Sequence, residues 1–526
     1  MAGAAGQEVD LTGVMVSANL TVSDYFIVAP VVIPILFGAI LMMLRSKRNW
    51  QAPIAIAGFA IALFAEFGLL QQVIAEGPRT MTMGRWLPPF GISFTVDLTG
   101  ALFAFTGGVV ALAGAIYSWR DVTPTGRRYG FYPFFMLMMA GVSGAFLTGD
   151  IFNLYVWFEV LLISSFGLIV LGSEKPQLDG TMKYAFLNLV ATTMFLVATG
   201  YLYGITGTLN MADIRDKVGQ LDQAAPLMTI AILYLLAFSM KAAAFPLNFW
   251  LPASYHTPKI VVSAIFAGLL TKVGVYALLR VMLMLFAVPR DLLAEPIAWL
   301  AALTMLAGAF GALAQNDIRR VLGYVVITGI GTMLAGLSLA TQTGVTGTIV
   351  YAIHSMLVMT ALYMAAGVMS RLNGSFDMRQ LGGLYAASPM LAAGFLVLAI
   401  SVSGLPPTSG FWGKFILVKA SLEMGAWWLA AAILIAGFLT TLAVFRIWIF
   451  AFWRGGPEGT RDGAEAWSIG EAEPDYVLHS SLAIGFFVAA SLFIGFAPEL
   501  LISTAGEAAH GLLHSQDYVN SVFGGR

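Results

Sequence analysis

Residues 258–286 read PKIVVSAIFAGLLTKVGVYALLRVMLMLF, an almost continuous apolar run. A membrane-spanning helix needs about 20 apolar residues to cross roughly 30 Å of hydrocarbon. Lys272 lies fourteen residues after Pro258, which is about 21 Å along an ideal helix. The stretch therefore predicts a transmembrane helix with a lysine at bilayer depth, where the side chain cannot easily reach water.

Thirteen other apolar runs have a similar length. Together with the first, the runs fall at 25–44, 52–75, 96–119, 130–148, 150–171, 179–206, 226–249, 258–286, 294–315, 318–342, 344–371, 388–422, 425–453 and 476–500. Membrane β-strands alternate apolar and polar residues over about ten residues, whereas these runs are continuous. The sequence predicts an all-α integral membrane protein of about 14 transmembrane helices.

The composition supports a membrane protein and excludes several functions. Of the 526 residues, 59% are hydrophobic and 10% are charged. There is no cysteine, so disulfides, thiolate zinc sites and iron–sulfur ligation are excluded. The net charge of −1 and the dispersed basic residues argue against nucleic-acid binding. We expect no metal site and no obvious redox centre. No cleaved signal peptide is expected either, because no basic segment precedes the first apolar run.

The loops between the runs differ in their content of Lys and Arg. The odd-numbered loops hold fifteen of these residues and the even-numbered loops hold five. The positive-inside rule places the odd loops in the cytoplasm, so both termini are expected outside. The longest polar stretch, 454–475, is predicted to be a loop and not a separate domain.

Six basic residues fall inside the apolar runs: Lys241, Lys272, Arg280, Lys414, Lys419 and Arg446. A lysine at the centre of a membrane helix costs roughly 2.5 to 3.5 kcal/mol on insertion scales. Arg280, Lys419 and Arg446 lie toward helix ends or long turns, where they can snorkel to the interface. The other three require a partner, a water path or a function.

One acidic residue matches these lysines. Glu159 lies nine residues after Asp150, about 14 Å into its span. A Glu–Lys pair can tie two helices together or exchange protons, and the sequence leaves both alternatives open. Burial disfavours the charged form of a lysine and a nearby carboxylate favours it, so such a pair can control proton binding.

Prolines and glycines interrupt two of the spans. Lys241 is followed by Pro246 and Pro252, and Lys414 is preceded by residues 403–410, SGLPPTSG. Both sequences predict broken helices, in spans seven and twelve. Broken helices at equivalent positions indicate a transport site between inverted repeats. We expect two inverted five-helix repeats: spans four to eight (TM4–8) within 129–290, and spans nine to thirteen (TM9–13) within 291–454. The two breaks then fall at equivalent positions, and 1–128 and 455–526 flank the repeats.

Two histidines are candidates for proton handling. His354 lies in span eleven, and imidazole titrates near neutrality unless its surroundings perturb it. It is either a proton carrier or a packing residue. His256 precedes span eight and is either a proton entry point or an ordinary loop residue.

Four separated motifs resemble a known family. They are TGDIFNLYVWFE at 148–159, MKAAAFP at 240–246, GLLTKVG at 268–274 and SGLPP through GK at 403–414. They resemble the proton-translocating antiporter-like subunits shared by respiratory complex I and Mrp-type cation/proton antiporters. The segment GITGTLNMAD at 204–213 is similar to the D-type subunit of the Mrp multisubunit Na⁺/H⁺ antiporter.

This resemblance implies roles for individual residues. Glu159 and Lys241 would form the coupling pair, Lys272 and His354 the central axis, and Lys414 the terminal lysine. It also implies a bacterial cell-membrane complex that exchanges protons for Na⁺, with partner subunits like Mrp A, B, C, E, F and G. The resemblance implies no cofactor in this subunit. After His354 the run reads SMLVM, whereas such D-type subunits often carry an acidic residue and then a lysine, so side chains or water could complete the axis there.

Three alternatives to an antiporter subunit follow. The first is a proton-pumping subunit of a complex I-like or membrane-hydrogenase-like respiratory enzyme. The second is a membrane enzyme acting on lipid or polyprenyl substrates, which is disfavoured because the ionisable groups are expected at mid-depth. The third is a scaffold whose buried charges only fix helix packing.

Overall fold

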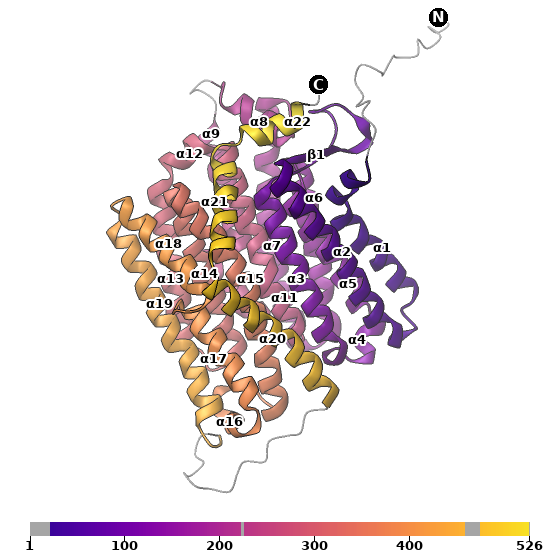
Figure 1. Cartoon of the computed structure of the whole chain (residues 1–526), viewed down its shortest axis with the longest axis vertical. Helices are drawn as coiled ribbons and strands as arrows, with labels where there is room; N and C mark the ends of the chain where they lie inside the picture. The colour runs from indigo at the N-terminus through magenta and orange to yellow at the C-terminus, as the bar shows by residue number, and fades with distance from the viewer. Residues whose placement is uncertain (1–20, 222–225, 458–473, 525–526) are drawn as a thin grey trace, which may run out of the picture.

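The computed structural model describes residues 21–221, 226–457 and 474–524. These residues form a bundle of helices that run alongside one another (Figure 1). Residues 1–20 of the N-terminal stretch and 458–473 of the predicted polar loop lie outside the described residues.

Eleven helices of the described chain are long and apolar enough to cross a membrane. They are α2 (Arg48–Glu76), α3 (Leu98–Asp121), α6 (Ile151–Ile169), α7 (Lys175–Thr206), α9 (Leu227–Ala242) continued by α10 (Trp250–Tyr255), α11 (Ile260–Leu279) continued by the π-helix η6 (Arg280–Leu285), α13 (Ala294–Ala314), α14 (Ile318–Leu339), α15 (Gln342–Asn373), α19 (Trp427–Trp448) continued by η8 (Ile449–Trp453), and α20 (Pro474–Phe496). Three shorter apolar helices are α1 (Ala29–Met43), α5 (Phe131–Leu147) and α17 (Pro389–Ser403). The predicted helical, multi-pass architecture is confirmed, with one short β-hairpin that was not predicted.

Short elements occupy the two ends of the bundle. The hairpin of β1 (Arg79–Thr82) and β2 (Ser93–Val96), α8 (Met211–Val218), α12 (Ala287–Leu292) and α22 (Gln516–Phe523) lie at one end. The opposite end carries α4 (Pro124–Arg128) and α16 (Leu384–Ala387) (Figure 1). Successive loops therefore alternate between the two ends.

The most enclosed helices are α11 and α15, whose most apolar stretches are buried along their whole length. The two helices pack against each other, and α15 also contacts α14, α18 (Ser409–Glu423) and α20. Gly268 allows the close approach, because a Cβ there would overlap the Thr360 hydroxyl. Lys272 and His354 consequently lie on the two helices farthest from the surface.

Both predicted helix breaks are present. Helix α9 ends at Ala242, Ala243 adopts a left-handed φ of 63°, and the 3₁₀ turn η5 (Leu247–Phe249) leads into α10. Helix α17 ends at Ser403, Gly404 has φ 84°, and α18 begins at Ser409. Proline disrupts a helix interior because it lacks the N–H donor and its ring clashes with the preceding turn. The breaks leave carbonyl groups that other residues must satisfy.

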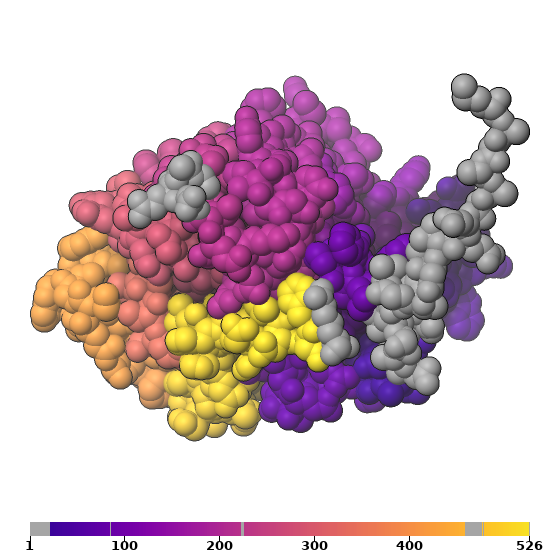
Figure 2. Space-filling view, turned by 90° about the horizontal axis from the view of Figure 1, so that it is seen from above, coloured from indigo at the N-terminus to yellow at the C-terminus, as the bar shows by residue number. Residues whose placement is uncertain are grey.

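The C-terminal segment continues beyond the last predicted span, which ended at residue 500. After α20 the chain forms α21 (Glu499–Leu513), which packs against α15 and α3. Thr99 Oγ1 donates to the Ala508 carbonyl at 3.2 Å. Seen from above, the yellow C-terminal residues lie between the magenta and purple parts of the chain (Figure 2).

Candidate functional site

Lys272 lies at the centre of the bundle on α11. Its side chain is fully buried, and Nζ donates to the Ala267 carbonyl at 2.6 Å. Among the described residues, this backbone oxygen is the hydrogen-bond partner of the amino group. The structure therefore encloses this lysine in protein.

His354 lies on α15, the neighbouring enclosed helix. Its imidazole is 1% exposed, and Nδ1 lies 2.8 Å from Ser409 Oγ. Its Nε2 has no hydrogen-bond partner among the described residues. Lys272 and Lys414 both act electrostatically on the imidazole. Helix α15 packs against both α11 and α18, so Lys272, His354 and Lys414 are buried on three helices that contact one another.

Lys414 lies on α18, after the second helix break. Its Nζ donates to the carbonyls of Val402 and Ser403, at 3.0 and 2.9 Å. These carbonyls belong to the last turn of α17, where the helix leaves its acceptors without intrahelical partners. Gly404 provides the necessary space, since a Cβ there would lie 3.3 Å from Nζ.

Lys241 and Glu159 do not form a direct ion pair among the described residues. Lys241 is 3% exposed, and its Nζ has no hydrogen-bond partner in the described chain. The Phe158 ring faces this ammonium group, with its centroid 5.4 Å from Nζ. Glu159 is only partly buried, yet it acts electrostatically on Lys241. The carboxylate therefore acts from a distance and not through contact.

Helix packing brings Lys241 toward the helix that carries Lys272. Helix α9 packs against α11, and a Cβ on Gly274 would lie 2.9 Å from the Ala242 nitrogen. The end of α9, which carries Lys241, therefore contacts α11 two residues beyond Lys272. Glycine at this position allows two lysine-bearing helices to meet.

The prediction that Arg280 snorkels to the membrane interface is wrong. It does not snorkel, because it is 1% exposed and forms a two-point ion pair with Asp97 at 2.6 and 2.8 Å. Arg280 also donates to the Tyr276 hydroxyl at 3.0 Å. The partner carboxylate lies 183 residues away on the turn before α3, so no local sequence signal could link the two.

The other two peripheral cations lie near water or a helix end. Lys419 has a side chain that is 57% exposed and pairs with Glu423 at 3.7 Å. Arg446 donates to the carbonyls of Leu313, at 2.5 Å, and of Gln315. An exposed ion pair and the carbonyls at a helix end therefore account for the positions of these two cations.

Sequence reasoning missed a buried carboxyl group, Glu66 on α2. It is 2% exposed, and one oxygen accepts a hydrogen bond from Ser143 Oγ at 3.1 Å. The other oxygen has no partner among the described residues and lies against Gly108. An acidic residue inside the apolar run 52–75 is the same signal that identified Glu159, so this residue was detectable.

His256 lies between α10 and α11, outside the spanning helices. Its Nδ1 lies 2.8 Å from the Pro252 carbonyl and its Nε2 lies 3.0 Å from an Arg320 nitrogen. Burial and the nearby Arg320 lower the pKa of His256 below its usual value. These contacts hold the neutral imidazole, with the proton on Nδ1.

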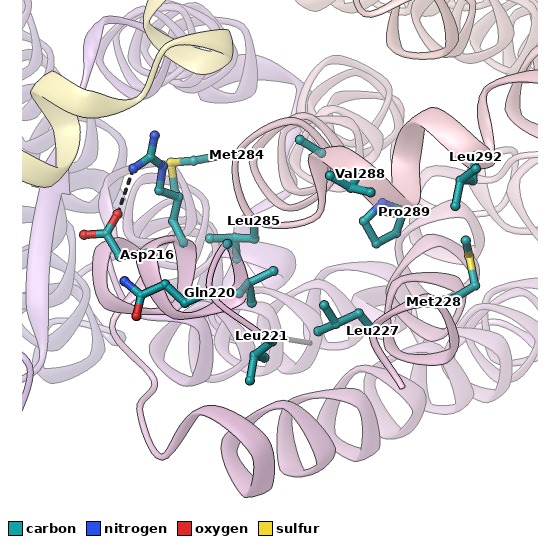
Figure 3. Close-up of a pocket in the computed structure, with 14 residues that line it drawn as sticks. Asp216, Gln220, Leu221, Leu227, Met228, Met284, Leu285, Val288, Pro289 and Leu292 are labelled. Atoms are coloured by element: carbon teal, nitrogen blue, oxygen red, sulfur yellow. Dashed lines mark hydrogen bonds and ion pairs between the residues drawn. The ribbon is translucent and has the colours of Figure 1, made fainter. Parts of the chain in front are cut away.

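Two cavities lie near the ends of the bundle. The larger, of about 880 Å³, is formed by α8, α9 and α12 and is lined by Leu227, Met228, Met284 and Val288 (Figure 3). A smaller cavity of about 340 Å³ at the other end includes Asp121, Lys259 and Arg371. Neither includes the buried lysines or His354. In the described chain, no cluster of three or more His, Asp or Glu side chains is arranged to hold a metal ion.

Comparison with known proteins identifies relatives over nearly the whole chain. The family model described as "NADH:quinone oxidoreductase/Mrp antiporter, TM" matches residues 148–440. The D-type subunit of the Na(+)/H(+) antiporter of Alkalihalophilus pseudofirmus is 38% identical over 498 residues, covering 94% of this chain and 99% of the relative. The protein of the same name from Bacillus subtilis is 37% identical, with the same shares covered.

Solved structures with the same fold include a chain of the Mrp complex from Dietzia sp. DQ12-45-1b. Its TM-score is 0.88 at 28% identity, covering 96% of this chain and all of that one. A chain of the archaeal membrane-bound sulfane sulfur reductase has a TM-score of 0.84 at 23% identity, covering 95% and 99% of the two chains. At that identity the likeness concerns the fold alone.

The four sequence motifs that suggested a family all lie inside the matched residues 148–440. The resemblance is therefore confirmed. The chain belongs to the NADH:quinone oxidoreductase/Mrp antiporter transmembrane family.

Proposed function

We propose that this protein is the D-type, proton-translocating subunit of a multisubunit Na⁺/H⁺ antiporter. The observation that carries the proposal is its 38% identity to the D-type Na(+)/H(+) antiporter subunit of Alkalihalophilus pseudofirmus, across 99% of that relative. The buried Lys272, His354 and Lys414 supply groups that can bind and release protons in the enclosed core. The protein is a secondary transporter subunit and not an enzyme.

In this proposal Glu159 and Lys241 form the coupling pair. Lys241 lacks a direct partner in the described chain and Glu159 acts on it from a distance. A small movement of α6 against α9 would change the charge stabilisation of the lysine and hence its proton occupancy. Lys272 and His354 continue the path, and Lys414 is its terminal lysine at the α17/α18 break.

The finer architecture belongs to the same proposal. Fourteen spans arise when α1, α5 and α17–α18 cross the membrane with the eleven long helices. The breaks at α9/α10 and α17/α18 then occupy the fourth helix of each repeat, in 129–290 and 291–454, and support inverted topology. Regions 1–128 and 455–526 flank the two repeats. Both termini lie outside a bacterial cell membrane in this assignment, and the partners are subunits like Mrp A, B, C, E, F and G.

Transport by the whole complex in inverted membrane vesicles tests this function. We expect Lys241→Ala and Glu159→Ala to abolish Na⁺-driven proton movement, followed with a pH-sensitive dye, while the complex still assembles. Lys419→Ala is the matched control, because it removes an exposed lysine that forms a surface pair. Antiport retained in both site variants would contradict the proposed roles.

A second candidate is a proton-pumping subunit of a respiratory complex. The description of the matched family, which names NADH:quinone oxidoreductase beside the Mrp antiporter, favours it. The subunit composition of the complex purified from its native membrane separates the two. Redox subunits would support the respiratory function, and their absence together with Na⁺-dependent exchange would support the antiporter.

A further inference from the structure

Three buried serine hydroxyl groups form a closed ring beside His354. Ser401 lies near the end of α17, Ser409 begins α18, and Ser491 lies on α20. The Oγ atoms are separated by 3.1 Å (401 to 409), 2.8 Å (401 to 491) and 2.9 Å (409 to 491). All three side chains are at most 1% exposed. The ring joins both halves of a broken helix to a helix outside the proposed repeats.

The ring uses all the protons that its members carry. Each hydroxyl has one hydrogen and can accept from other donors. Three contacts among three hydroxyls are all hydrogen bonds when each serine donates once around the ring. Ser409 Oγ then has no hydrogen left for His354, whose Nδ1 lies 2.8 Å away. In this arrangement Nδ1 must carry the proton and donate it to Ser409.

The other tautomer makes one hydrogen bond fewer. If Nδ1 has no proton, Ser409 must donate to it, and one contact in the serine ring then has no hydrogen between its oxygens. Buried polar groups without partners are costly, so the proton on Nδ1 is favoured. Nε2 is then a bare acceptor, in agreement with its lack of a partner in the described chain.

Gly410 leaves room for the imidazole in this position. A Cβ on residue 410 would lie 3.0 Å from Nε2 and would overlap the Ser401 carbonyl. The charged groups acting on His354 are Lys272 from α11 and Lys414 from α18, and Tyr351 lies one helical turn earlier with its ring 5.3 Å from the imidazole.

We propose that the Ser401–Ser409–Ser491 ring is a positioning device that fixes the tautomer of His354. It holds the proton on Nδ1, so that Nε2 is the nitrogen available to accept a proton on the axis. Because the ring needs α17, α18 and α20 together, a movement of the broken helix or of α20 opens it and releases the tautomer. This inference rests on the proposed proton-translocating function, and it adds α20 to the elements that control His354.

Solid-state nitrogen NMR on the assembled complex, labelled with ¹⁵N-histidine, tests the proposal directly. The His354 signals are assigned by their loss in His354→Gln. In the wild-type complex we expect a protonated Nδ1 and a bare Nε2. A proton on Nε2 in the wild-type protein would overturn the proposal whatever the variants do, including any that fail to assemble.

Serine variants supply the second part of the test. Ser491→Ala opens the ring and frees the Ser409 hydrogen for Nδ1, so we expect proton density to appear on Nε2 and antiport to fall about fivefold, the ratio equivalent to one average hydrogen bond. Ser491→Thr retains the hydroxyl and should restore both readouts. Ser421→Ala is the control, because this buried serine of α18 donates only to its own helix at Leu417.

The outcomes separate the inference from the function on which it rests. A wild-type complex without Na⁺-dependent proton movement contradicts the proposed function, whereas the tautomer is still measurable. A transporting complex in which Ser491→Ala leaves the tautomer and the rate unchanged contradicts the ring alone. Equal losses in Ser491→Ala and Ser491→Thr would also contradict it, since they would indicate a packing effect.

Discussion

The ammonium group of Lys414 lies 2.9 Å from the carbonyl oxygen of Ser403, across the break between α18 and α17. A helix C-terminus carries partial negative charge and acceptors without intrahelical partners. Lys414 therefore satisfies the end of one half-helix while being carried by the other. A charge at this point couples the geometry of the break to the protonation of one side chain.

Replacement of Lys414 by methionine should uncouple the two half-helices. Lys414→Met retains an unbranched side chain one atom shorter than lysine and leaves the carbonyls of Val402 and Ser403 without this donor. We expect a loss of about 1–3 kcal/mol in stability, because buried acceptors lose their partner. Thermal unfolding of the purified complex measures it, with Lys419→Met as the exposed control. Equal melting temperatures for the two variants would contradict the capping role.

The buried Asp97–Arg280 pair should behave as a unit. Arg280→Met leaves Asp97 buried without its cation, and we expect a loss of about 3–5 kcal/mol. Asp97→Asn retains an acceptor for the α3 cap, where the aspartate accepts from the Gly100 N–H at 2.9 Å. The double variant should be more stable than the sum of the single losses predicts. Strict additivity in unfolding measurements would show that the pair contributes no coupling.

His256 should make the protein sensitive to mild acid. Its folded-state pKa is lowered by burial and by Arg320, so the unfolded chain binds the proton more readily in the pH range just below 6.5. The contribution of neutral His256 to the free energy of unfolding therefore increases with pH through this range. It is fully present above about pH 6.5 and is lost on acidification. When the pH is lowered from about 7.5 to about 5.5, the melting temperature of His256→Asn should fall less than that of the wild-type protein. An equal or larger loss in the variant would refute this sign.

Gly410 should not tolerate a side chain. A Cβ there would overlap the Ser401 carbonyl and lie 2.8 Å from His354 Cε1, so α18 would have to move. We expect Gly410→Ala to lower stability by roughly 1–3 kcal/mol. Gly485→Ala on α20 is the control, because no atom lies within 4 Å of its Cβ position and alanine favours a helix by up to about 1 kcal/mol. Melting shifts of the same sign would contradict the steric explanation.

Local patterns predicted the features that depend on one segment at a time. The apolar residues around Lys272 continue for a full span and predict a spanning helix, and the structure encloses this helix in protein. The breaks after Lys241 and before Lys414 followed from proline chemistry. Glu66 carries the same local signal as Glu159, so its burial was also within reach of the sequence.

A multi-pass helical protein, two broken helices, the family and the charged residues of the apolar spans could all be predicted from the order of the residues. What those charges face became known from the packing of the helices. It showed that Arg280 is paired with Asp97, that Glu159 does not touch Lys241, and that three distant serines meet at His354. The physical reason is that hydropathy and helix breaking are properties of neighbouring residues, whereas contacts between helices depend on how each helix is rotated by its packing.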